Sequence, residues 1–309
     1  MNQIRNIQNK TDFLSNSDFT KLEYFDLLEL ALKFKNGKTS IDMGKKVLGL
    51  VFDKASTRTR VSFQVAMSRL GGTTIDLNPG TTQIGRGEPI RDTARVLSRY
   101  CDVLAIRTFH HFDIKEYAKW ATIPVINALT DLEHPCQALA DFLTMKEEFG
   151  DFSKIKLTFI GDGNNVANSL IICGAILGAK VNIVCPKGFE PPKEILELAK
   201  SSCLNNSNIF ITDNIVDGIT GSNVLYTDVW SSMGQESNKS LKEERFKGYT
   251  LDQELMSKAE NDVIIMHCLP AYRGKEISND VFESSRSRIF NQAENRLYAQ
   301  QALLAKLMK

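Results

Sequence analysis

The sequence predicts an α/β protein of two domains, each a parallel β-sheet flanked by helices. Short apolar runs typical of buried strands alternate along the chain with longer segments whose apolar residues recur at helical spacing. Strands that alternate with helices form parallel sheets covered on both faces. A chain of 309 residues is long enough for about two cores. A new series of strands begins after Gly150, so we expect the domains to meet near that residue.

The first half alternates helix and strand from residue 11 onward. We expect helices at 11–38, 61–70, 90–100 and 134–149. We expect strands at 47–52, 73–77, 101–107 and 124–128. Segment 78–88 is polar and rich in glycine, which indicates a loop.

The second half repeats this alternation. Strands are expected at 156–160, 181–185, 208–212, 224–227 and 263–267. Helices are expected at 165–177, 191–201 and 291–309. In open α/β sheets, ligands bind beyond the carboxyl ends of the strands, so polar residues there are the first candidates for a site.

The overall charge excludes several classes of partner. The 38 basic and 37 acidic side chains nearly cancel, so no broad positive field favours nucleic acid or an acidic membrane. No apolar run approaches the roughly 20 residues of a membrane span. The six cysteines are scattered and no signal peptide is recognisable, which favours free thiols and a cytoplasmic location.

The stretch Ser56-Thr57-Arg58-Thr59-Arg60 joins a buried strand to a helix. A helix N-terminus offers unpaired N–H groups, and arginine adds paired donors that match phosphate oxygens. The structural alternative is a Ser or Thr cap followed by solvated arginines. Taken alone, this stretch does not decide between the two.

Further polar residues lie at expected strand ends or helix starts. They are Arg107, the run His134-Pro135-Cys136-Gln137, Asp228, and the run His267-Cys268-Leu269. Each singly is explained by packing or a satisfied hydrogen bond. Together they point to one edge of each sheet.

Two other sites are disfavoured. The run from Gly161 to Val166 follows a strand as a dinucleotide fingerprint would, but its third glycine position is Val166 and no acidic residue ends the next strand. A zinc site from His134, Cys136, His267 and Cys268 lacks any recognised ligand spacing.

These motifs resemble the aspartate/ornithine transcarbamoylase family. The carbamoyl phosphate signatures correspond to 52–60 and 134–137, and ornithine-type features to 161–165, 228–234 and 267–270. The resemblance runs from about residue 12 to the C-terminus. It implies transfer of a carbamoyl group from carbamoyl phosphate to the δ-amine of L-ornithine, giving L-citrulline and phosphate, in arginine metabolism and with no cofactor or metal.

The resemblance also implies an architecture and a set of site residues. Residues 1–149 would bind carbamoyl phosphate, 150–290 ornithine, and helix 291–309 would pack back on the first domain, with the active site in the cleft between domains of a homotrimer or multiple of trimers. The carbamoyl phosphate residues would be Ser56, Thr57, Arg58, Thr59, Gln83, Arg107, His134, Pro135, Cys136, Gln137, Cys268, Leu269 and Arg296. The ornithine residues would be Asn165, Asp228, Ser232 and Met233. Arg107, His134, Asp228 and Cys268 would be catalytic.

Some alternatives stay open at this point. Another acceptor amine, such as putrescine, or a catalytically silent ligand-binding trimer would carry many of the same motifs. The role of Arg86 is open, and Arg60 is either a phosphate ligand or one half of a structural ion pair.

Overall fold

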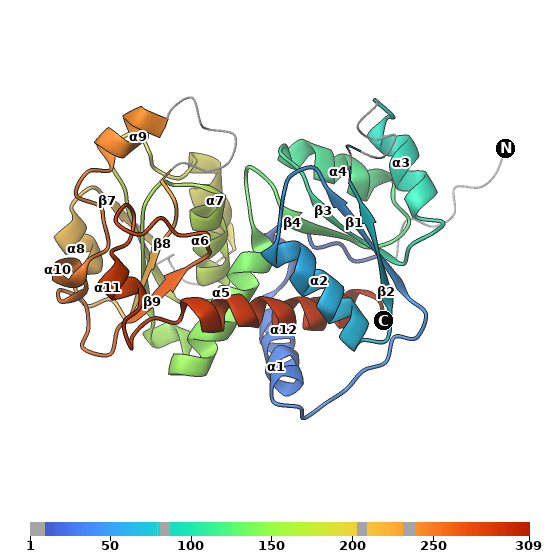
Figure 1. Cartoon of the computed structure of the whole chain (residues 1–309), viewed down its shortest axis with the longest axis horizontal. Helices are drawn as coiled ribbons and strands as arrows, with labels where there is room; N and C mark the ends of the chain where they lie inside the picture. The colour runs from blue at the N-terminus through green and yellow to red at the C-terminus, as the bar shows by residue number, and fades with distance from the viewer. Residues whose placement is uncertain (1–9, 79, 81–86, 203–208, 231–238) are drawn as a thin grey trace. The chain divides into compact units, whose positions relative to one another are not determined.

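The computed structural model describes residues 10–78, 80, 87–202, 209–230 and 239–309 (Figure 1). The chain divides into two compact units, which we call unit 1 (Met1–Leu139 with Arg296–Lys309) and unit 2 (Ala140–Asn295). The divisions fall within helices α5 (Pro135–Phe149) and α12 (Ile289–Leu307). The sequence analysis set its boundary at residue 149 instead.

Unit 1 contains a four-stranded parallel sheet in the order β2-β1-β3-β4 (Figure 1). Its strands are β1 (Val47–Phe52), β2 (Thr73–Leu77), β3 (Val103–Arg107) and β4 (Val125–Leu129). Phe52 pairs with Arg107, and the register between β3 and β4 shifts at Ile106/Arg107. The carboxyl ends of β1 and β3 therefore lie side by side, with an irregularity that re-aims the backbone where Arg107 stands.

Helices cover the sheet of unit 1. They are α1 (Lys21–Lys35), α2 (Arg58–Arg69), α3 (Ile90–Leu97), α4 (His111–Trp120), the start of α5 and the end of α12. The expected helix at 11–38 is wrong over its first part. Thr20 and Glu23 form a capping box that starts α1, and Phe13 pairs with Ile126 beside β4. Helix α4 was not anticipated.

Unit 2 contains a five-stranded parallel sheet in the order β7-β6-β5-β8-β9. Its strands are β5 (Lys156–Ile160), β6 (Lys180–Val184), β7 (Ile209–Thr212), β8 (Val224–Thr227) and β9 (Ile264–His267). Thr227 pairs with His267, so Asp228 and Cys268 leave neighbouring strands at the same level. The predicted alternation of strand and helix and the parallel sheets are thereby confirmed.

The helices of unit 2 are α6 (Asn165–Leu177), α7 (Lys193–Ser201), α8 (Ile215–Ile219), α9 (Lys239–Arg245), α10 (Gln253–Met256), α11 (Asn279–Phe282), the remainder of α5 and the start of α12. Helix α6 is buried along its whole length, which agrees with its almost uninterrupted apolar sequence. Short 3-10 helices occur at Asn16–Asp18 and Phe152–Lys154. Within the described ranges, no helix has the length and apolar character needed to cross a membrane.

Candidate active site

The stretch Ser56 to Arg60 lies at the start of α2. The helix begins at Arg58, and Thr57 occupies the N-cap position with helical backbone angles. The Thr57 side chain makes no capping hydrogen bond to the helix. The cap explanation of this stretch is therefore wrong for Thr57, and the first-turn N–H groups are positioned as an anion site requires.

Arg107 extends from the end of β3 toward this helix start. Its side chain is 6% exposed, and its Nη1 donates to Ser56 Oγ at 3.4 Å. Burial is the main cause that lowers the pKa of Arg107 to about 10, and the charges of Arg296, Arg58 and Arg60 add to it. Arg107 remains charged even at this lowered pKa. Arg58, Arg107 and Arg296 together therefore carry more positive charge than their surroundings neutralise.

His134 and Gln137 join this cluster from the start of α5, whose first residue is Pro135. Both side chains are buried, and Arg296 donates to Gln137 Oε1 and, at 2.9 Å, to Thr59 Oγ1. Burial, followed by the charges of Arg296, Arg107 and Arg58, holds the pKa of His134 well below its usual value. His134 is therefore a neutral imidazole at pH 7 and retains one N–H donor.

Arg60 has a different role from its neighbours. Its guanidinium forms an ion pair with Asp76 of β2 and lies over the Phe52 ring, 5.0 Å from the ring centroid. Arg60 thus fastens the start of α2 to the sheet, which confirms the ion-pair interpretation.

In unit 2, the turn between β5 and α6 supplies the first contact to Asp228. Asn164 caps α6 by accepting from the N–H groups of Val166 and Ala167, and its Nδ2 donates to Asp228 Oδ2 at 2.8 Å. Asn165 is the first residue of α6. A side chain at Gly163 would put Cβ 2.4 Å from the backbone nitrogen of Pro191. Close backbone packing therefore explains this glycine without a dinucleotide.

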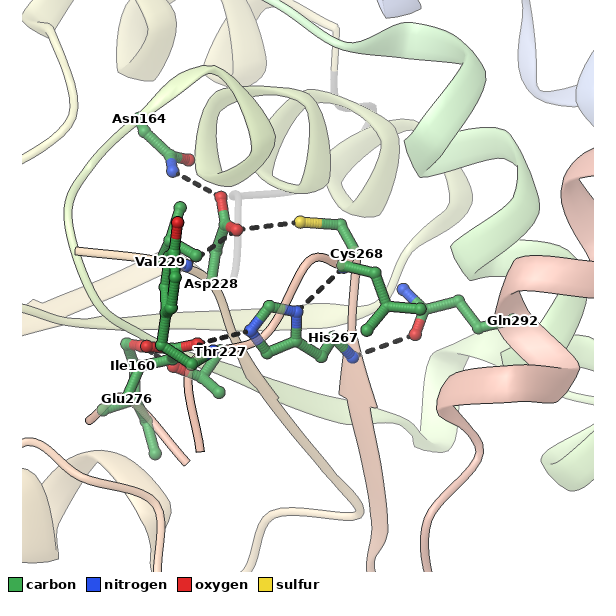
Figure 2. Close-up of polar contacts among 11 residues, drawn as sticks. Ile160, Asn164, Thr227, Asp228, Val229, His267, Cys268, Glu276 and Gln292 are labelled. Atoms are coloured by element: carbon green, nitrogen blue, oxygen red, sulfur yellow. Dashed lines mark hydrogen bonds and ion pairs between the residues drawn. The ribbon is translucent and has the colours of Figure 1, made fainter. Parts of the chain in front are cut away.

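Asp228 and Cys268 lie in direct contact beyond the ends of β8 and β9, as Figure 2 shows. The Cys268 thiol donates to Asp228 Oδ1 at 2.9 Å, and the Val229 N–H donates to the same oxygen at 2.8 Å. With Asn164 on the other oxygen, three donors orient a carboxylate that is 6% exposed. Cys268 is partly exposed, whereas Cys101, Cys136, Cys173 and Cys185 are buried free thiols.

His267 and Glu276 support the turn that carries Cys268, and the sequence analysis assigned neither this role. His267 Nδ1 accepts from the Leu269 N–H at 2.8 Å, while Nε2 lies 3.2 Å from Glu276 Oε1 (Figure 2). An Nδ1 that accepts must be unprotonated, so Nε2 carries the proton and donates to Glu276. The hydrogen bond from the Leu269 N–H to His267 Nδ1 holds Leu269 at a φ of 60°.

Asp228, His267 and Cys268 offer ligand atoms within 4.8 Å of one another, which is a spacing open to a metal ion. Both His267 nitrogens are already used in hydrogen bonds, and Asp228 accepts from three donors. Cys136 of the proposed zinc set is fully buried and donates its thiol to Asn127 O at 3.3 Å, and burial raises its pKa to about 12. The donor chemistry of these residues does not fit a metal centre.

The structure thus gathers Ser56 to Thr59, Arg107, His134 to Gln137 and Arg296 in unit 1, and Asn165, Asp228, Cys268 and Leu269 in unit 2. Gln83, Arg86, Ser232 and Met233 lie outside the described residues. Sequence reasoning missed three buried supporting residues. Glu133 accepts from the backbone N–H of Asn16, Glu276 pairs with His267 Nε2, and Gln292 accepts from the His267 N–H. No local sequence pattern reveals these contacts.

Comparison with known proteins matches both halves of the chain. The family model for the aspartate/ornithine carbamoyltransferase carbamoyl-P binding domain matches residues 11–147, and that for the Asp/Orn binding domain matches 153–307. The ornithine carbamoyltransferase of Prochlorococcus marinus (strain MIT 9312) is 66% identical over 297 residues, covering 96% of each chain.

Two solved structures extend the comparison. The ornithine carbamoyltransferase of Pyrococcus furiosus has a TM-score of 0.93 at 43% identity and covers 97% of each chain. That of Gloeobacter violaceus has a TM-score of 0.88 at 46% identity, covering 97% of this chain and 99% of its own. This chain belongs to the aspartate/ornithine carbamoyltransferase family.

Proposed function

We propose that this chain is a carbamoyltransferase that converts carbamoyl phosphate and L-ornithine to L-citrulline and phosphate. The observation that carries the proposal is the cationic cluster of unit 1, in which Arg58, Arg107 and Arg296 surround a neutral His134. Burial and then repulsion from Arg296 and Arg58 lower the pKa of Arg107, and a bound dianion such as carbamoyl phosphate offsets the repulsion. The relatives named above carry the same activity in their names.

Each group has a chemical role in this reaction. Ser56, Thr57, Arg58 and Thr59 bind the phosphate, together with Gln83, and Arg107 reaches both phosphate and carbonyl oxygen. Attack by the amine puts negative charge on the carbonyl oxygen, where Arg107 and the His134 N–H donate. Preorganised donors of this kind contribute about 10²–10³ each in kcat. Pro135, Cys136, Gln137 and Arg296 hold His134 and the carbamoyl end.

Ornithine binds through the residues of unit 2. Asp228 pairs with the α-ammonium, and Asn165, Ser232 and Met233 complete the ornithine site. Cys268 contacts the δ-amine and, with Leu269, the carbamoyl group that the amine attacks. A free alkylammonium has a pKa near 10.4, so the δ-amine must lose a proton before attack. The N–C bond then forms and the C–O bond to phosphate breaks. One of the two N–H protons of the attacking amine passes to the departing phosphate, a stronger base than its ester, and the other stays on the citrulline nitrogen.

The test is direct formation of citrulline. Purified protein is mixed with carbamoyl phosphate and ornithine, and citrulline is assayed, with putrescine and aspartate as alternative acceptors. We expect citrulline with ornithine and no carbamoylated product with putrescine or aspartate. Product with putrescine would reassign the acceptor, and no product with any amine would favour a silent ligand-binding protein.

We also propose that the protein is a homotrimer or a multiple of trimers. Val61 and Val65 of α2, Ile75 of β2, and Val96 and Tyr100 near α3 expose apolar side chains on unit 1, which supports burial against another subunit. Light scattering should give a multiple of three chains of 34.6 kDa. The free thiols support a cytoplasmic location.

A further inference from the structure

A buried glutamine, Gln292, lies in the first turn of α12 and uses both ends of its amide. Its Nε2 donates to Asp141 Oδ1 at 2.6 Å and to Tyr226 Oη at 3.0 Å. Its Oε1 accepts from the His267 N–H at 2.9 Å (Figure 2). A primary amide has two N–H donors and one carbonyl, so all of its polar groups are engaged. Asp141, Tyr226 and Gln292 are fully buried.

The His267 N–H needs this partner because β9 is the last strand of its sheet. Alternate N–H groups of an edge strand point away from the neighbouring strand and must be satisfied elsewhere. Ile265 donates to Arg286 O, and Arg288 returns a bond to Ile265 O. At His267, two residues after Ile265, the segment that runs beside β9 has already become α12. The His267 N–H therefore donates to the Gln292 side chain instead of to backbone.

The position of this amide connects it to both ornithine-binding side chains of unit 2. His267 immediately precedes Cys268, and Tyr226 lies two residues before Asp228. The amide therefore accepts from the backbone of β9 and donates to the Tyr226 hydroxyl, whose side chain comes from β8. Both residues lie just before the two that share the 2.9 Å contact from Cys268 Sγ to Asp228 Oδ1. A change in its length or polarity alters the relative placement of these strand ends.

We propose that Gln292 is a positioning residue for the ornithine half of the reaction: it holds the Cys268 thiol against Asp228 through the backbone of His267. This inference rests on the proposed function. It predicts an effect that falls mainly on the acceptor amine, because the three hydrogen bonds of Gln292 reach only residues of unit 2, whereas the phosphate-binding residues Ser56 to Thr59 and Arg107 lie in unit 1.

Gln292→Leu removes all three hydrogen bonds at similar volume. Misplacement of a reacting group by about 1 Å costs on the order of 100-fold in rate. We expect kcat/KM for ornithine to fall by about 10- to 100-fold, with the KM for carbamoyl phosphate within about twofold of the unmodified protein. Gln292→Glu keeps the acceptor for His267 and, by sharing one proton with Asp141, restores one donor. The kcat/KM of Gln292→Glu for ornithine should lie between those of Gln292→Leu and the unmodified protein.

The matched control is Asn295→Leu. Asn295 is a buried amide of the same helix and donates to Thr144 Oγ1 at 2.9 Å and Glu147 Oε2 at 2.6 Å, both on α5. It ties α12 to α5 without a bond to His267. Thermal unfolding should be comparably affected in Asn295→Leu and Gln292→Leu, while only the latter should lose ornithine turnover selectively.

A second readout does not depend on activity. Alkylation of Cys268 by iodoacetamide, followed by peptide mass spectrometry, reports whether its thiol still donates to Asp228. We expect alkylation several-fold faster in Gln292→Leu and unchanged in Asn295→Leu. If the unmodified protein made no citrulline, the proposed function would fail, while the labelling rates would still decide the role of Gln292.

Folded Gln292→Leu whose ornithine kinetics and Cys268 labelling match those of Asn295→Leu would overturn the proposal. If Gln292→Leu does not fold, Gln292→Glu decides it by the same two measurements. Equal ornithine kinetics and equal labelling of Gln292→Glu and the unmodified protein would then overturn it, and selective loss would support it.

Discussion

Replacing Arg107 with glutamine should make the ligand-free protein more stable while removing its response to phosphate. The pKa of Arg107 is lowered from its usual value to about 10, with burial as the main cause and Arg296, Arg58 and Arg60 adding to it. Arginine does not lose its proton at neutral pH, so the shift is a cost to folding. At about 1.4 kcal/mol per pKa unit, that cost is about 3 kcal/mol.

The substitution also removes a favourable contact. The 3.4 Å hydrogen bond from Arg107 to Ser56 is worth about 1 kcal/mol, which leaves a net gain of about 2 kcal/mol. For a chain of this size, such a gain corresponds to a rise of a few degrees in Tm. Thermal unfolding in phosphate-free buffer measures it, with Arg99→Gln as a control that removes an exposed arginine from the same unit.

Addition of phosphate or carbamoyl phosphate then separates the two variants. A ligand present at 100 times its Kd stabilises the protein by about 2.7 kcal/mol. We expect the ligand to raise the Tm of the unmodified protein and of Arg99→Gln by the corresponding amount, and to raise that of Arg107→Gln very little. An Arg107→Gln protein that was less stable than the control without ligand, and that still responded fully to phosphate, would refute the electrostatic reasoning.

The remaining predictions concern single groups. Arg58→Ala should raise the KM for carbamoyl phosphate by about 10- to 100-fold, the worth of one charged hydrogen bond, and initial rates at saturating ornithine measure this. Cys268→Ala should mainly impair ornithine use, with a smaller effect on the KM for carbamoyl phosphate, and intact mass during turnover should show no carbamoyl adduct on the unmodified protein. Thorough chelation should leave citrulline formation unchanged. Burial raises the pKa of Glu133 to about 7, so the protein loses stability as pH rises from about 4.5 to 7. Glu133→Gln should therefore gain Tm over the unmodified protein at pH 8 and not at pH 4.5; equal differences at both would contradict the assignment.

Strands could be predicted from sequence because each is a short apolar run ended by polar or turn residues. Residues 47–52, 73–77, 156–160 and 224–227 form strands with the expected bounds.

The wrong prediction of a helix at 11–20 has a physical cause. The apolar residues at helical spacing begin only at Leu22. Phe13 and Phe19 are instead buried against one another, with Phe13 in a bridge to β4, so tertiary pairing determines the backbone of this segment.

Candidate site residues could be placed from the sequence where they lie at the carboxyl ends of strands, as Arg107, Asp228 and Cys268 do, and their roles stay predictions. Their supports could not. Glu133 accepts from the backbone N–H of Asn16, 117 residues away, and Gln292 from that of His267, 25 residues away. Nothing near these residues in the sequence indicates the contact, since it arises only when distant segments fold together.

The electrostatics of unit 1 bear on the order in which substrates bind. Burial and then the charges of Arg296, Arg107 and Arg58 lower the pKa of His134, and at Arg107 the charges of Arg296 and Arg58 add to the effect of burial. A bound dianion offsets this positive charge and so stabilises the arginines, while His134 stays a neutral imidazole with one N–H donor. Ornithine instead brings ammonium groups, which the uncompensated positive charge of the empty protein repels. This difference favours carbamoyl phosphate as the first substrate and ornithine as the second.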